Sequence, residues 1–332
     1  MTALDTPDRS GLPHDRALAA QIAEALGAPD RAVARLSELE ARWDREDLVA
    51  AMRAAIAAPA LQVSDTGPVG LVTGSGGMAH RIPNVSTIAA IAASCVDGVV
   101  VAKPGSLRSR TRIVGPAGLA ARLGLRGACG EDDLRQQLAR NRFAIITTND
   151  LYPWLHLPDL CTLPFVVDAL DFTALQPCTA HWKVNGVIDN NPVLHGERCR
   201  SGHVERCLIV HGKTDSPELM IDDASTAGTT ELLLFTIGMA PARLSLEPED
   251  VGLARSRGMD LLVPDELAPE HVFTAIVTGE APRAWIELCA LATSVILVHA
   301  RAAVSFDDGV RHALALFRTG EVAAKVQRLR SF

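Results

Sequence analysis

The sequence predicts an α/β protein in which a small all-helical N-terminal domain joins a larger α/β domain with a mostly parallel sheet flanked by helices. Between residues 15 and 58, apolar residues recur three and four positions apart with charged residues between them, which is typical of amphipathic helices. After Pro68, short β-branched runs alternate with helical stretches. That alternation indicates parallel strands joined by helical crossovers.

The N-terminal part predicts three helices, in "ALAAQIAEAL", "RAVARLSELEARW" and "REDLVAAMRAAIAA", with Asp44 as a candidate N-cap of the third. The stretch "APALQVSDTGP" contains Pro59 and Pro68 and predicts a linker. We therefore expect a helical domain over residues 1–64, joined by a segment at about residues 152–173, and an α/β domain over residues 65–332.

The α/β part predicts strands in "VGLVTG", "GVVVAKPG", "FAIITTN", "RCLIVHG" and, more weakly, "ELLLFTI". Helical stretches such as "PAGLAARLGL" and "DDLRQQLARN" lie between them. The chain from residue 269 to 329 is again helical. Its first half, "WIELCALATSVILVHARAAV", is apolar enough for a buried core helix, and "DDGVRHALALFRTGEVAAKVQRL" is amphipathic.

Composition excludes several classes of protein. With 332 residues, 48% of them hydrophobic, the chain can bury a large core. Its net charge of −7 argues against a general nucleic-acid binder. The longest apolar stretch is too short to span a bilayer, and the N-terminus lacks the apolar core of a secretory signal. We therefore expect a cytoplasmic protein that binds neither nucleic acid nor membrane.

Cysteines and histidines give no sign of a disulfide framework or a metal site. The seven cysteines are scattered and form no C-x-x-C pair, so we expect reduced packing residues. The histidines at positions 181, 195, 203 and 211 lack the spacing of metal ligands.

The stretch "VTGSGGMAHRIPNVSTIAA", residues 72–90, predicts a strand, a glycine-rich bend and a helix. Unpaired backbone N–H groups and the helix dipole make such a junction an anion site, most often for phosphate. It matches neither a P-loop nor the G-x-G-x-x-G fingerprint, and a purely structural turn is the alternative. The glycines allow close backbone approach, and neutral polar side chains follow; these residues are Gly74, Ser75, Gly76, Gly77, Asn84, Ser86 and Thr87.

Taken in order, these motifs resemble those of the anthranilate phosphoribosyltransferase family, which belongs to glycosyltransferase family 3 and has the nucleoside phosphorylase type II fold. That family shows G-T-G-G-D-G, then N-I-S-T, then K-H-G-N-R after the next strand. This chain has "GSGGMA", "NVST" and "KPGSLR" at the same places. Later, "VERCLIVHG" resembles V-V-H-G, and "LEPEDVGL" resembles L-D-P-E-D-F-G-L.

The resemblance implies a phosphoribosyl pyrophosphate donor with Mg²⁺, from which diphosphate leaves C1 of the ribose as a nucleophile attacks. Loop amides, a lysine and the metal would stabilise the leaving group. Donor-binding residues carried over are Gly74, Ser75, Gly76, Gly77, Asn84, Ser86, Thr87, Lys103 and Gly105, with Lys103 just past a strand. Candidate phosphate contacts are His80, Arg81 and Arg108, for which a solvated loop is the alternative. Candidate metal ligands are Glu218 and Ser86.

The chain departs from the family on the metal side. The loop's Asp-Gly is replaced by "MA" at residues 78–79, and the family's Asp-Glu metal pair becomes Pro217-Glu218. Asp215, Asp222 and Asp223 are nearby carboxylates. Spacing alone neither assigns nor excludes them as substitutes.

A second group of departures lies on the acceptor side, at Pro104, Ser106, Tyr152 and Leu160. The family's arginine for the anthranilate carboxylate falls in "LPDLCTLPFVV", which has no arginine or lysine. Tyr152 and Trp154 either stack on an acceptor ring or pack a loop.

The chain keeps the family's donor-binding motifs and lacks its acceptor-binding motifs. This combination predicts a phosphoribosyltransferase whose acceptor is not anthranilate, for example an aminocyclitol or aromatic amine of specialised metabolism. A non-catalytic relative that binds or regulates and a true anthranilate phosphoribosyltransferase are the alternatives. The resemblance also implies a homodimer through the helical domain, with the site in a cleft between the domains.

Overall fold

The computed structural model describes residues 13–56, 61–63, 67–75, 78, 80–107, 114–152, 154, 160, 163–169, 177–188 and 204–331. Its centre is an eight-stranded sheet with the order β3-β4-β2-β1-β5-β6-β7-β8. All pairs from β3 to β6 are parallel, whereas β6–β7 and β7–β8 are antiparallel. The prediction of an α/β fold with a mostly parallel sheet is confirmed.

The strands are β1 Val69–Thr73, β2 Val100–Gly105, β3 Gly127–Ala128, β4 Phe143–Thr147, β5 Trp182–Gly186, β6 Arg206–Gly212, β7 Thr230–Thr236 and β8 Ala242–Leu246. β1, β2, β4, β6 and β7 match the five predicted runs. The sequence patterns did not predict β3, β5 and β8. They also placed Lys103 just past a strand, whereas Lys103 lies inside β2, paired with Ile145 of β4.

The helices beside the sheet are α4 Val85–Ala93, α5 Pro116–Arg122, α6 Glu131–Asn141, α7 Thr148–Leu151, α10 Pro269–Val277, α11 Arg283–His299, α12 Phe306–Arg318 and α13 Glu321–Arg330. Two short 3₁₀ turns, η3 Pro248–Val251 and η4 Gly258–Leu261, precede α10. α11 packs against α4 and α12, and its residues from Leu288 to Leu297 are all buried. This is the predicted core helix.

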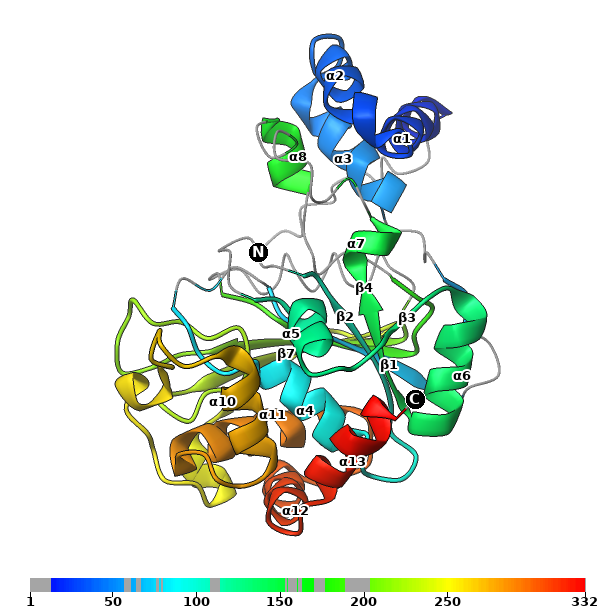
Figure 1. Ribbon diagram of the computed structural model, residues 1–332. Coiled ribbons are helices and arrows are strands. Elements are labelled where there is room, and N and C mark those ends of the chain that lie inside the picture. Colours follow the sequence, from blue (N-terminus) through cyan, green and yellow to red (C-terminus); the bar gives the residue numbers. More distant parts are fainter. Residues whose placement is uncertain are drawn as a thin grey trace.

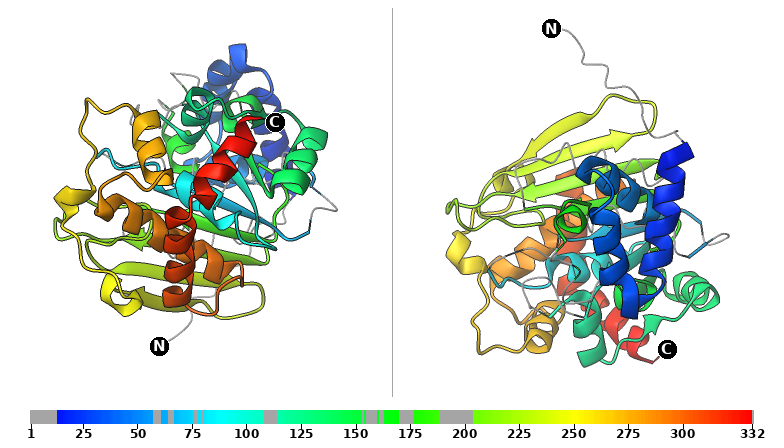
Figure 2. Two further views of the ribbon diagram at one scale, coloured as in Figure 1. Left: turned by 60° about the horizontal axis from the view of Figure 1, so that its bottom comes forward. Right: turned by 90° about the horizontal axis from the view of Figure 1, so that it is seen from above.

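A separate helical group consists of α1 Pro13–Leu26, α2 Pro29–Glu40, α3 Arg45–Ile56 and α8 Pro164–Ala169. Ile22, Leu36 and Met52 of the first three helices share one apolar cluster with Phe165 of α8. Figure 1 shows these helices together on the side of the sheet where β4 ends and α7 begins. In Figure 2, α11 to α13 (orange to red) lie on the opposite side of the molecule from α1 to α3 (blue). The division into two domains at residue 64 stays a prediction.

Helices long and apolar enough to cross a membrane are absent from the described part of the chain.

Candidate functional site

The glycine-rich junction lies where β1 ends and α4 begins. Gly74 and Ser75 follow the last residue of β1, and Asn84 is the N-cap residue of α4. Ser86, in the first turn of α4, has its hydroxyl oxygen 3.7 Å from the position of a Cβ on Gly74. The strand end and the helix start therefore face one another, as an anion site of this type requires. Gly76 and Gly77 lie outside the described residues.

Asp222 is hydrogen-bonded to this loop. The backbone N–H of Ser75 donates to Oδ2 of Asp222 at 2.6 Å, and the Ser75 hydroxyl donates to the same oxygen at 2.8 Å. Oδ2 lies 2.9 Å from the position of a Cβ on Gly74. A side chain at position 74 would crowd the carboxylate unless the Asp222 side chain moved, so the glycine permits this close approach.

Two glycines in neighbouring strands leave room for the backbone of Asp222 and Asp223 to lie against the sheet. An ideal Cβ on Gly186, the last residue of β5, would lie 1.5 Å from the carbonyl oxygen of Asp222. One on Gly212, the last residue of β6, would lie 2.5 Å from the carbonyl oxygen of Asp223. The segment also pairs with β6, because Ile221 exchanges two backbone hydrogen bonds with Gly212. These contacts bring Asp222 and Asp223 over the carboxyl ends of β5 and β6.

Burial and neighbouring charges shift the pKa values of Lys103 and Asp223. Lys103 is 1% exposed, and burial lowers its pKa to about 8, while the carboxylates of Asp223 and Asp222 act in the opposite direction. Burial and the charge of Asp222 raise the pKa of Asp223, against the effects of Lys103 and of a hydrogen bond from the Ser86 backbone N–H. Two carboxylates, one ammonium group and a helix N-terminus therefore share one small volume.

The oxygen ligands that the site offers suit Mg²⁺. This ion binds through one or two carboxylates and completes its shell with phosphate oxygens and water. Asp222 and Asp223 supply two carboxylates beside the glycine-rich junction. Within the described ranges, no three His, Cys, Asp or Glu side chains converge on one point. A metal held here would thus depend on oxygens of its ligand.

A family model described as the glycosyl transferase family, a/b domain, matches residues 71–323 of the chain. The chain belongs to this family. It is a family of enzymes, and the phosphoribosyltransferase relationship inferred from the motifs is confirmed.

Two curated relatives illustrate the relationship. The anthranilate phosphoribosyltransferase of Rubrobacter xylanophilus is 27% identical over 313 residues, covering 92% of this chain and 89% of its own. That of Roseiflexus castenholzii is 24% identical over 316 residues, covering 93% and 90%.

Solved structures of two anthranilate phosphoribosyltransferases show the same fold. The anthranilate phosphoribosyltransferase of Thermus thermophilus superposes with a TM-score of 0.73 at 23% identity, covering 97% of this chain and 96% of its own. The Saccharomyces cerevisiae enzyme in complex with PRPP (phosphoribosyl pyrophosphate) and Mg gives 0.74 at 15% identity, covering 96% and 92%.

Glu218, the residue at the family's metal-pair position, does not contact the described part of the loop as Asp222 does. Glu218 is exposed, and among the described residues no hydrogen bond or ion pair links it to the glycine-rich junction. Asp215 instead accepts a hydrogen bond from the backbone N–H of Gly258 at 2.8 Å. The sequence left Asp215, Asp222 and Asp223 equal, and the geometry separates them. The assignment of Glu218 stays a prediction.

The candidate phosphate contacts have different surroundings. His80 is exposed. The guanidinium group of Arg81 donates to the carbonyl oxygens of Pro264, at 3.0 Å, and Asp265, at 2.9 Å, and also to that of Leu267. Arg81 therefore ties the loop to the segment before α10. Arg108 lies outside the described residues.

The remaining donor residues lie at the start of α4 and at the end of β2. Asn84 donates from its side chain to the carbonyl oxygen of Val114 at 3.4 Å. Thr87 is buried, and its hydroxyl has no hydrogen-bond partner within the described part of the chain. Gly105 ends β2, where a Cβ would lie 2.4 Å from Cβ of Pro116. Their role in donor binding stays a prediction.

The predicted acceptor residues divide into two groups. Pro104 is buried within β2, and Ser106 follows it. Tyr152 and Leu160 are 7% and 1% exposed and belong to the apolar cluster of the helical group. Tyr152 packs edge-on against Trp154 with 5.9 Å between ring centroids. These side chains form part of a packed core.

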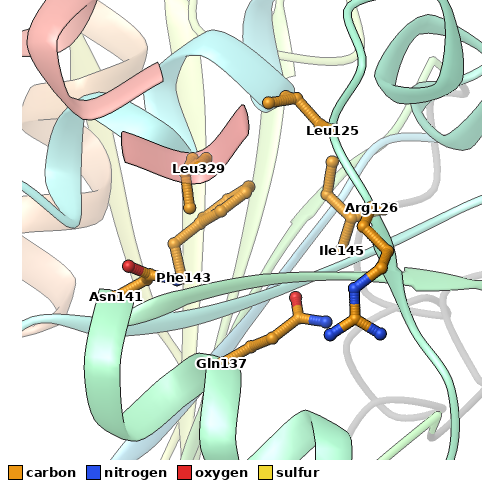
Figure 3. Close-up of a pocket in the computed structure, with 7 residues that line it drawn as sticks. All are labelled: Leu125, Arg126, Gln137, Asn141, Phe143, Ile145 and Leu329. Atoms are coloured by element: carbon orange, nitrogen blue, oxygen red, sulfur yellow. The ribbon is translucent and has the colours of Figure 1, made fainter. Parts of the chain in front are cut away.

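A small cavity lies elsewhere, between β4, α6 and α13 (Figure 3). None of the predicted site residues line it. Its lining residues are Leu125, Arg126, Gln137, Asn141, Phe143, Ile145 and Leu329.

Proposed function

We propose that the protein transfers 5-phosphoribose from phosphoribosyl pyrophosphate, bound with Mg²⁺, to an acceptor other than anthranilate. The observation that carries the donor part is the convergence of the Gly74-Ser75 backbone, the N-terminal turn of α4 and the buried Lys103 with two carboxylates. Phosphate groups bind at such junctions because backbone N–H groups and the helix dipole point at them.

The chain's own residues would act mainly by position and charge. The N–H groups of the loop and of the first turn of α4 would hold diphosphate oxygens. Lys103 would place a positive charge beside the leaving group as negative charge develops on it. Asp222 and Asp223 would hold the cation, and Mg²⁺ when bound would offset part of the diphosphate charge.

The acceptor part is supported by the absence of arginine and lysine from the segment where the family's carboxylate anchor falls. From residue 143 to 182 there is no lysine or arginine. Leu160 belongs to an apolar cluster and is 1% exposed. A leucine provides no bidentate hydrogen bonds to a carboxylate. We therefore infer an acceptor whose binding does not depend on an arginine-held carboxylate, such as an aminocyclitol or an aromatic amine.

Release of diphosphate in the presence of donor, Mg²⁺ and a panel of acceptors tests the proposal. The panel contains anthranilate, aromatic amines without a carboxylate, and aminocyclitols. We expect acceptor-dependent release with a member of the second or third class. Turnover of anthranilate at the roughly 1–10³ per second usual for enzymes would contradict the acceptor assignment.

We also propose that two copies pair through the helical group of α1, α2, α3 and α8. Sedimentation velocity at micromolar concentration should show a dimer. A single monomeric species there would contradict it.

A further inference from the structure

We propose that Asp222 is an internal anionic occupant of the phosphate loop, which makes anion binding at the loop depend on a divalent cation. The inference deepens the proposed function and rests on it for the identity of the site. It concerns the carboxylate that already accepts both hydrogen bonds offered by Ser75.

The first step concerns the hydrogen bonds. The Ser75 N–H donates to Asp222 at 2.6 Å and its hydroxyl donates to the same oxygen at 2.8 Å. Hydrogen bonds to an ionised acceptor are roughly twice as strong as neutral ones. A phosphate oxygen at the loop would accept the same hydrogen bond from the Ser75 N–H. It must therefore displace the Asp222 carboxylate before it can bind there.

The second step concerns the position of the carboxylate. The backbone of Asp222 is fixed against Gly186, where a Cβ would lie 1.5 Å from its carbonyl oxygen, and by the pairing of Ile221 with Gly212. The residue is 5% exposed. The backbone thus keeps the side chain at the loop, while rotation of the side chain alone is enough to vacate the amide.

The third step concerns charge. The second carboxylate, Asp223, accepts from the backbone N–H of Ser86, so it occupies the N-terminal turn of α4. Lys103 offers one positive charge to both carboxylates. A metal-free diphosphate would add more negative charge at short range, which is unfavourable in a buried site. A divalent cation offsets this charge and gives the Asp222 carboxylate another partner.

The experiment is calorimetric titration with inorganic pyrophosphate, once with Mg²⁺ and once with a chelator. The proteins are the full chain and the variants Asp222→Asn and Asp222→Ala. Asparagine keeps an acceptor of the same shape without the charge, whereas alanine removes the acceptor. Asp265→Asn is the matched control, because Asp265 is exposed and lies outside the loop.

We expect the unsubstituted chain to bind pyrophosphate with Mg²⁺ and to bind it at least about tenfold more weakly without. Metal-free affinity should rise in Asp222→Asn and rise further, at least about tenfold in all, in Asp222→Ala. Asp265→Asn should match the unsubstituted chain in both conditions.

The outcomes separate this inference from the proposed function. Binding of Mg-pyrophosphate by the unsubstituted chain, with no metal-free gain in either Asp222 variant, overturns the inference and leaves the donor site standing. A metal-free gain in the variants without any Mg-dependent binding by the unsubstituted chain overturns the cation dependence that the inference states, and contradicts the metal-dependent donor as well. Pyrophosphate binding to none of the proteins contradicts both.

Thermal unfolding of each variant shows whether it is folded at the titration temperature. A second measurement needs no variant: hydrogen exchange of the Ser75 amide in the ligand-free chain. The inference requires that this amide be protected by Asp222. Exchange at the rate of an unprotected amide would overturn it.

Discussion

The carbonyl oxygen of Asp222 occupies the space that a side chain on Gly186 would need, 1.5 Å from an ideal Cβ at that position. Gly186 is the last residue of β5, and the Asp222 side chain reaches the end of β1. A single missing side chain therefore permits a segment 36 positions later in the sequence to lie over the sheet and present a carboxylate to the glycine-rich loop.

Replacing Gly186 with alanine should destabilise the protein by about 1–3 kcal/mol, because backbone atoms must move to admit the methyl group. Urea unfolding measures this free energy. Gly27→Ala is the control, since its Cβ would meet carbonyl oxygens of Ala23 and Glu24 at an ordinary 3.5 Å. Equal stability of Gly186→Ala and the unsubstituted chain would show that the Asp222 segment does not lie against β5.

Lys103→Met should cost about 3–5 kcal/mol of unfolding free energy, because it removes a buried cation from beside two carboxylates. Adding Asp223→Asn should recover part of the loss, since it removes one of the charges left unpaired. Chemical denaturation of the two single variants and the double variant gives the coupling. Lys213→Met is the control, because its ion pair with Glu231 is solvent-exposed and worth less than about 1 kcal/mol. Additive effects at positions 103 and 223 would contradict the coupling.

His299 makes stability depend on pH. Burial lowers its pKa from 6.5 to about 3, and the nearby charge of Arg206 acts in the same direction. Below about pH 6.5 the unfolded chain takes up a proton that the folded chain excludes. The free energy of unfolding therefore keeps its full contribution from the uncharged His299 above about pH 6.5. As the pH falls from there toward about 3, this contribution is lost, by at most about 1.4 kcal/mol per pH unit.

The matching variant is His299→Phe, which keeps an aromatic ring against Trp182. Between pH 6.5 and 4.5, unfolding free energies should shift in favour of the variant by about 2–3 kcal/mol. His271→Gln is the control for losing a histidine from an exposed position. A constant difference between His299→Phe and the unsubstituted chain across this range would contradict the buried, uncharged state.

Much of the fold was predictable because its signals are local. β-branched runs mark β1, β2, β4, β6 and β7, and the apolar run of α11 marks the core helix. β5 was missed because its sequence, "WKVNG", carries Lys183 and Asn185, which look like loop residues but are fully buried. β3 has two residues and β8 is an exposed edge strand, so neither has a buried pattern to detect.

The candidate site was predictable only where a motif carries it. The glycine loop and the start of α4 follow from one local pattern, and Lys103 follows from the resemblance of "KPGSLR" to the family's K-H-G-N-R segment. Asp222 and Asp223 reach the loop through tertiary contacts with the ends of β5 and β6, which no local pattern expresses. The available signal was a pair of strand-ending glycines, Gly186 and Gly212, preceding an acidic pair. This signal can be interpreted only when β5 and β6 are known to be neighbours in the sheet.

The most direct test of the account is calorimetric titration of the chain with phosphoribosyl pyrophosphate and Mg²⁺, beside Lys103→Met under conditions where that variant is folded. The account predicts saturable binding by the unsubstituted chain and an affinity roughly 10- to 100-fold lower in the variant, as expected for losing a charged hydrogen-bond donor. Absence of binding by the folded, unsubstituted chain, or equal affinity of the two proteins, would contradict it.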